Sequence, residues 1–308
     1  TDAVSDPRHP APTPAPPSPR RDAAVAATLV VILTLSIQTG SALAVLAIRS
    51  VGVYQTLWMR IAFAALILVI VRPHVLRRLP PKGQRLPLAG LAVTLFLMNL
   101  SFYEAVSRVP VGIVVAIEFV GPLGIAVIGT RRRLDWLWIV LAGVGVIVLA
   151  GPSGAVTGAG LFFALAAGMW WGMYLLLAKR AVSGLDPLSV TALMLVGATF
   201  LATPVLAVHG VKLAGHWDAV LLGVIIAVVS SAFPYLLEMM ALRRVRAATY
   251  GVLLSIEPAV AALAALIVLG QRVSALEGAA MAAVMAAAAG ASWTTGGAAE
   301  AGVELPAP

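Results

Sequence analysis

The stretch Asn99-Leu-Ser-Phe-Tyr-Glu-Ala-Val-Ser-Arg-Val-Pro-Val-Gly-Ile-Val-Val-Ala-Ile-Glu-Phe-Val-Gly-Pro122 places two glutamates, Glu104 and Glu118, in a largely apolar run. An ionised side chain inside a bilayer costs several kcal/mol unless it has a partner, a proton or a water-filled cavity. The stretch therefore predicts membrane-spanning helices that carry acidic groups for a purpose, and a membrane carrier is the interpretation that we favour.

A related stretch occurs in the second half of the chain. Between residues 233 and 258, Glu238 and Glu257 take positions that correspond to Glu104 and Glu118, and Pro258 corresponds to Pro122. Five spans in each half is an odd number, so homologous halves would have opposite orientations in the membrane. Inverted repeats of this kind recur in carriers, with the substrate near the midplane. Chance similarity between Ala- and Leu-rich helices is the alternative.

The composition excludes several classes of protein. Of 308 residues, 61% are hydrophobic and 11% charged, and the mean hydropathy is +0.99, far outside the range of soluble domains. There is no cysteine, no phosphate-binding Gly-Lys-Ser loop and no paired-histidine motif. We therefore expect neither an enzyme nor a cofactor or metal, and no nucleic acid as a partner.

The hydropathy pattern predicts an all-α membrane protein with ten transmembrane helices. Since a span needs about 20 apolar residues, the segments that qualify are about 25–48, 54–71, 87–106, 110–130, 135–151, 158–178, 188–208, 219–240, 247–269 and 275–293. We expect a disordered Pro-rich tail over 1–22, a first five-helix repeat over 23–152, a second over 153–293, and a disordered tail over 294–308.

The basic residues predict the orientation of the chain. Most of the 21 lysines and arginines fall in the N-terminal tail or in loops that share its side, whereas the opposite side holds only Arg49, Arg108, Lys212 and Arg272. Because cytoplasmic loops are enriched in Lys and Arg, both termini are expected in the cytoplasm. This placement also explains the net charge of +8 without an acidic ligand.

Two glutamates lie beside predicted helix breaks. Pro122 cannot donate a hydrogen bond to the Glu118 carbonyl, and Pro258 leaves a carbonyl free next to Glu257. Broken turns inside a membrane are tolerated where they line a cavity. Glu118 and Glu257 are thus predicted to bind substrate or a proton, although a packing kink with a neutral glutamate would also fit.

Other charged residues are candidates for the same site. Arg60 is the basic residue placed within a span, where it can pair with a glutamate, receive a substrate carboxylate or extend to the interface. Pro234 is expected to free the carbonyl of Ser230. Glu104 and Glu238 are predicted near span ends, where a carboxylate can also simply face water.

Further polar and aromatic residues are predicted to line the pocket, but contacts between helices would explain most of them equally well. They are Gln38, Thr39, Ser41, Asn99, Ser101, Tyr103, Trp170, Trp171, Tyr174 and Ser255.

Three motifs resemble the ten-helix EamA-type carriers of the drug/metabolite transporter superfamily, and within it the inner-membrane threonine and homoserine exporters. They are Pro110–Pro122, Leu237–Leu242 and Thr249–Pro258, and the likeness spans about residues 25–293. The chain departs from the pattern at Arg246, where these repeats usually carry proline, as at Pro110.

The resemblance implies efflux of small amino acids across the cytoplasmic membrane by proton antiport, with alternating access between the halves. The expected partners of the chain are a small-molecule substrate and the lipid bilayer, and protons and a second copy in a homodimer are further candidates. Export of drugs or other metabolites by the same fold is one alternative, and a membrane scaffold that transports nothing is another.

Overall fold

The computed structural model describes residues 19–77, 80–127, 133–150, 156–211, 213, 215–245 and 247–300, and every regular element in these ranges is a helix. Residues 1–18 and 301–308 of the two predicted tails, Arg246, and part of the predicted boundary between the repeats lie outside these ranges.

The helices follow the predicted spans. Three of these spans, 110–130, 219–240 and 247–269, are each divided into two or three helical elements. The elements are α1 (Pro19–Val51), α2 (Val53–Val71), η1 (Pro73–Leu76), α3 (Lys82–Val106), α4 (Val111–Glu118), α5 (Val120–Val127), α6 (Arg133–Leu149), α7 (Gly158–Gly184), α8 (Pro187–His209), α9 (Trp217–Ala227), the π-helix η2 (Val228–Ala232), α10 (Phe233–Arg244), α11 (Ala247–Leu254), α12 (Glu257–Leu269) and α13 (Ala275–Glu300).

The terminal helices are longer than the sequence predicts. Residues 19–22 belong to α1 and residues 294–300 to α13, although both segments were expected in disordered tails. Proline is favoured at the first position of a helix, which agrees with the start of α1 at Pro19. Extension of an existing helix needs no new nucleus, so polar residues can prolong it.

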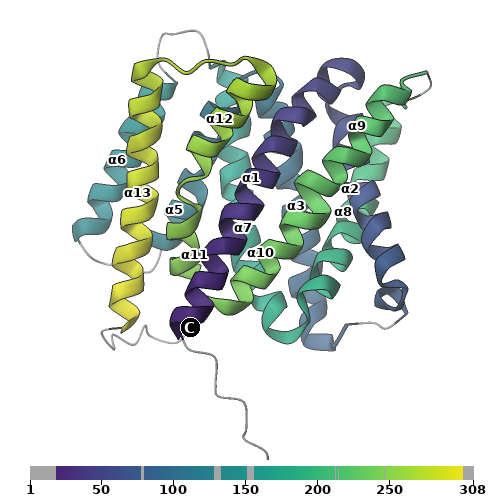
Figure 1. Ribbon diagram of the computed structural model, residues 1–308, viewed down its shortest axis with the longest axis horizontal. Coiled ribbons are helices and arrows are strands. Elements are labelled where there is room, and N and C mark those ends of the chain that lie inside the picture. The colour runs from purple at the N-terminus through teal and green to yellow at the C-terminus, as the bar shows by residue number, and fades with distance from the viewer. Residues whose placement is uncertain are drawn as a thin grey trace, which may run out of the picture.

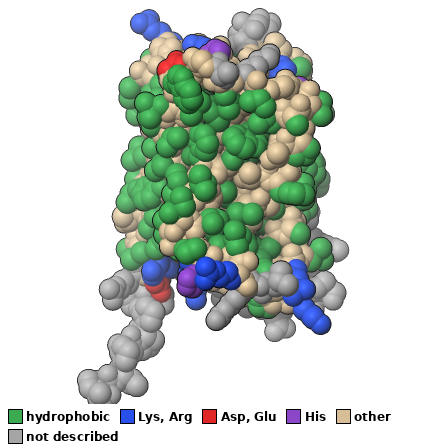
Figure 2. All heavy atoms as spheres, turned by 90° about the vertical axis from the view of Figure 1, so that its right-hand side faces the viewer, with side chains coloured by type: hydrophobic (Ala, Val, Ile, Leu, Met, Phe, Trp, Pro, Cys, Tyr) green, Lys and Arg blue, Asp and Glu red, His purple; other side chains and the backbone are tan. Residues whose placement is uncertain are grey.

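The outer surface is that of a multi-pass membrane protein. Seven helical segments in the described part of the chain are long and apolar enough to cross a bilayer, and three shorter apolar helices accompany them. Figure 2 shows hydrophobic side chains in a broad band between two ends that carry the charged residues. In Figure 1 the helices run between these ends, and α1 begins at the same end at which α13 finishes.

Helices of the two sequence halves pack closely against each other (Figure 1). Helix α3 contacts α7 and α8, α1 contacts α10 and α12, and α4 contacts α7 and α12. One such contact lies at the break between α4 and α5. Gly168 of α7 packs there so close to the carbonyl oxygen of Glu118 that an added Cβ atom would clash with it. Glycine at position 168 thus permits the close approach that places Glu118.

We predict that Gly168→Ala lowers the melting temperature of the purified protein. The added methyl group meets backbone atoms that cannot move aside, and overpacking of this kind costs about 1–3 kcal/mol. Gly143→Ala is the matched control, because a Cβ atom there has no neighbour within 4 Å. Equal melting temperatures for the two variants would contradict the close contact at Gly168.

Candidate functional site

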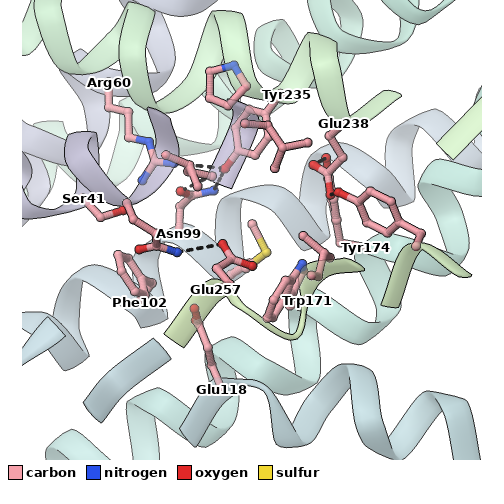
Figure 3. Close-up of a pocket in the computed structure, with 17 residues that line it drawn as sticks. Ser41, Arg60, Asn99, Phe102, Glu118, Trp171, Tyr174, Tyr235, Glu238 and Glu257 are labelled. Carbon is pink, nitrogen blue, oxygen red and sulfur yellow. Dashed lines mark hydrogen bonds between the residues drawn. The ribbon is translucent and has the colours of Figure 1, made fainter. Parts of the chain in front are cut away.

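A cavity of about 60 Å³ lies at the centre of the protein. A buried water needs at least about 10–15 Å³, so the cavity has room for a few waters. Figure 3 shows its walls. They are formed by Leu33, Ile37, Gln38, Ser41, Arg60, Met98, Asn99, Phe102, Glu118, Trp171, Tyr174, Pro234, Tyr235, Glu238, Tyr250, Leu254 and Glu257.

Arg60 of α2 is held by the irregular turn of the neighbouring span. Its Nη2 donates to the carbonyl oxygen of Ser230 and its Nε to Oγ of Ser231, both at 2.8 Å. Ser230 lies in the π-helix η2, four residues before Pro234, which cannot donate a hydrogen bond to it. The carbonyl that the sequence predicts to be free is therefore an acceptor for the buried guanidinium.

Two tyrosines complete the surroundings of Arg60. Its guanidinium lies 5.5 Å from the ring centroid of Tyr103 and 5.9 Å from that of Tyr235, within range for cation–π attraction. It donates to both hydroxyls, at 3.4 and 3.2 Å. Asn99 fixes Tyr235 by donating to its hydroxyl at 3.1 Å. Arg60 is only 2% exposed, so it does not extend to the interface.

Among the described residues, Arg60 has no acidic hydrogen-bond partner, although it interacts electrostatically with Glu118. All its hydrogen-bond acceptors in the described residues are neutral oxygens, and none of the ion pairs there includes it. A buried guanidinium with only neutral partners can still accept an anion, and its planar fork suits a carboxylate.

Glu257, the first residue of α12, is joined to Gln38 of α1. Nε2 of Gln38 donates to Oε1 of Glu257 at 2.7 Å. The remaining oxygens, Oε2 of Glu257 and Oε1 of Gln38, are buried and have no hydrogen-bond partner in the described part of the chain. Leaving a buried polar atom unpaired costs about 1–3 kcal/mol. Both oxygens therefore favour a ligand that brings hydrogen-bond donors.

Glu118 is the last residue of α4 and also faces the cavity (Figure 3). Among the described residues, none donates a hydrogen bond to its carboxyl group, and its side chain is nearly buried. Glu118 interacts electrostatically with both Arg60 and Glu257. The cavity is thus lined by one positive group, Arg60, and by the two open carboxyl groups of Glu118 and Glu257.

Glu238 differs from the other two glutamates, because both of its oxygens have donors. The hydroxyl of Tyr174 donates to Oε2 at 2.7 Å, and that of Tyr250 donates to Oε1 at 2.9 Å. Glu238 was expected near a span end, but α10 continues to Arg244, so the residue lies within the helix and lines the cavity.

Tyr235 and Tyr250 were missed as candidates. Tyr235 stands three residues before Glu238 in one helix, a spacing that places the two on one face. Tyr250 belongs to the Thr249–Pro258 motif, which was used only for the resemblance. The helical spacing could have identified Tyr235, whereas the partner of Tyr250 lies on another helix.

Glu104 does not line the cavity. It forms an ion pair at 2.5 Å with Arg108, four residues later, near the end of α3. Nη1 of Arg108 also donates to the carbonyl oxygen of Glu104. The two glutamates that correspond in sequence, Glu104 and Glu238, therefore have different surroundings.

Several other predicted residues also lie outside the cavity wall. Ser255 donates to the carbonyl oxygen of Val252 at 2.6 Å within the turn between α11 and α12. Tyr103 lies behind the wall, where it accepts a hydrogen bond from Arg60 and its ring contacts Phe102. Thr39 bonds to the carbonyl oxygen of Leu35 in its own helix. The others that are absent from the wall are Ser101, Trp170, Pro122 and Pro258.

Comparison with known proteins extends these observations. Residues 158–293 match the EamA-like transporter family. The threonine/homoserine exporter RhtA of Salmonella typhimurium strain LT2 is 39% identical over 274 residues, which cover 86% of this chain and 91% of that protein.

Two further comparisons agree in coverage. The threonine/homoserine exporter RhtA of Escherichia coli strain K12 is 37% identical over 271 residues, 86% of this chain and 90% of that protein. A solved crystal structure superposes with a TM-score of 0.58 at 18% identity, over 87% of this chain and 97% of that chain. This structural likeness concerns the fold alone.

Proposed function

Because the chain belongs to the EamA-like transporter family, we propose that it exports threonine, homoserine and similar small amino acids across the cytoplasmic membrane. The family consists of transporters, so the chain is a transporter and not an enzyme. Relatives named as threonine/homoserine exporters support the substrate class, since each matches most of the chain.

The observation that carries the proposal is the distribution of charge around the central cavity. Among the described residues, Arg60 has no hydrogen bond or close ion pair with an acidic group, while Glu118 and Glu257 present open carboxyl oxygens to the same space. An amino acid zwitterion complements both groups, with its carboxylate at Arg60 and its ammonium group at the glutamates. Such pairing offsets part of the cost of burying charged groups in a low-dielectric site.

Alternating access between the halves is part of the proposal. Most of the residues that line the cavity are buried, so the helices around it must separate to admit a substrate. The walls come from both sequence halves, with α1, α2, α3 and α4 facing α7, α10, α11 and α12. We propose that the halves are inverted repeats that rock about this site.

Proton exchange and orientation complete the proposed mechanism. Glu118 or Glu257 would release a proton as the ammonium group binds and take one up after it leaves, which couples export to the proton gradient. Both termini would lie in the cytoplasm. The bias of Lys and Arg supports this orientation, as does the location of the start of α1 and the end of α13 at one end of the molecule (Figure 1).

Isotope counterflow in proteoliposomes tests the proposed function. Vesicles loaded with unlabelled threonine are expected to accumulate labelled threonine, whereas propionate, which lacks the ammonium group, and propylamine, which lacks the carboxylate, do not exchange. Exchange of either single-charge solute as fast as threonine would favour export of other metabolites. Absence of exchange for a broad panel would favour a scaffold.

A further inference from the structure

Gln38 carries a free hydrogen-bond acceptor that recognition of a zwitterion alone does not require. Its Nε2 is engaged with Glu257 at 2.7 Å, which turns Oε1 away from that carboxyl group. The side chain is only 3% exposed, and Oε1 has no partner among the described residues. Since Gln38 lines the cavity, a ligand bound there can satisfy this oxygen.

The ammonium group of a zwitterion has better acceptors than an amide oxygen. Oε2 of Glu257 is unpaired, and the carboxyl group of Glu118 receives no hydrogen bond from a described residue. A hydrogen bond between charged groups is about twice as strong as one between neutral groups, so the ammonium binds to these carboxyl groups. Glu238 does not compete, because Tyr174 and Tyr250 occupy its oxygens.

We propose that Oε1 of Gln38 accepts a hydrogen bond from the side-chain hydroxyl of the substrate and thereby selects hydroxy amino acids. This inference rests on the proposed function and adds the residue that determines specificity. Threonine and homoserine each carry one side-chain hydroxyl, which supplies the donor that Oε1 lacks. An analogue with a methyl group in place of the hydroxyl leaves Oε1 buried and unpaired, and sites of this type reject such analogues strongly.

The position of Gln38 fits this role. Ser41 lies three residues later on α1, on the same face of the helix, and also lines the cavity (Figure 3). The apolar residues Ile37, Phe102 and Leu254 form other parts of the wall. The polar atom of the hydroxyl can therefore bind at α1 while the carbon chain packs against apolar side chains.

Two isosteric substrate pairs test the inference: threonine with valine, and homoserine with norvaline. Counterflow is measured for each solute in wild-type vesicles and in vesicles of the Gln38→Met variant, which keeps the length of the side chain but removes the acceptor. Wild-type protein is expected to prefer the hydroxy member at least about tenfold, and Gln38→Met to reduce the preference to about twofold or less.

Gln55→Met is the matched control. Gln55 is also 3% exposed, but it donates to the carbonyl oxygen of Gly210 at 2.8 Å and does not line the cavity. Its variant is expected to keep the wild-type preference for threonine over valine. The ratio of threonine to valine counterflow distinguishes the hydroxyl contact of Gln38 from its hydrogen bond to Glu257. Loss of the bond to Glu257 affects all zwitterions alike and therefore leaves this ratio unchanged.

Each outcome decides the matter. A Gln38→Met protein that keeps the wild-type ratio would overturn the assignment of the hydroxyl to Oε1. Equal counterflow of threonine and valine by wild-type protein would overturn it as well, even where the variant fails to fold. In both cases threonine is still exchanged, so the proposed function stands, whereas lack of any exchange in wild-type vesicles removes both.

Discussion

Replacing Arg60 by lysine is expected to reduce threonine counterflow by at least about 100-fold while the protein stays folded. Lysine keeps the positive charge but cannot reproduce the planar fork that donates to Ser230 and Ser231 and still faces the cavity. Truncating one partner of a buried hydrogen-bonded charge pair costs about 2–5 kcal/mol, which is the basis of this magnitude. Initial counterflow rates at equal protein density provide the measurement.

Arg72→Lys is the control for this experiment. Arg72 pairs with Asp186 at 2.7 Å, but its side chain is 45% exposed and it lies outside the central cavity. Because exposed ion pairs contribute at most about 1 kcal/mol, its variant is expected to keep wild-type counterflow. Equal rates for Arg60→Lys and wild type would show that the substrate carboxylate binds elsewhere.

Glu257→Gln is expected to reduce threonine counterflow about 10- to 100-fold. The substitution keeps the size of the side chain and an acceptor for Gln38, so the loss reports mainly the charge presented to the ammonium group. Hydrogen bonds to charged groups are worth about 1.5–3 kcal/mol, in agreement with this range. Glu118→Gln should act in the same direction, and the double variant should not exchange threonine measurably.

Glu104→Gln separates this effect from a general loss of acidic groups. Glu104 is paired with Arg108 at the end of α3 and does not line the cavity. Its variant is expected to transport threonine at nearly the wild-type rate. If the Glu104 and Glu257 variants lost the same fraction of activity, the carboxyl groups of the cavity would have no special role.

The comparison of Glu104 with Glu238 shows where sequence reasoning was too simple. The repeat gave these residues corresponding positions, and both were expected near span ends. Glu104 lies near the end of α3 beside Arg108, whereas Glu238 lies within α10 between two tyrosine hydroxyls. Local spacing identifies an i,i+4 ion pair, but it cannot identify Tyr174 and Tyr250, because they are on other helices.

The prediction around Pro234 depended on covalent chemistry. Proline has no N–H, so the carbonyl four residues earlier, that of Ser230, must find another donor wherever the helix packs. That the donor is Arg60 could not be read from the chain, since 170 residues separate the two. The hydrogen bond between Gln38 and Glu257 likewise could not be read from the chain, because 219 residues separate the two.

The sequence by itself determined that this is a multi-span helical membrane protein of the EamA type, and it indicated the acidic and basic residues buried in the spans. The EamA type followed from the resemblance of three motifs, and the rest followed because hydropathy, proline chemistry and the cost of charge in lipid act on short segments. Only the tertiary structure decided which of these residues share one cavity and which oxygens remain unpaired there. Those properties depend on the packing of α1, α2, α4, α10 and α12, whose contacts join residues far apart in the chain.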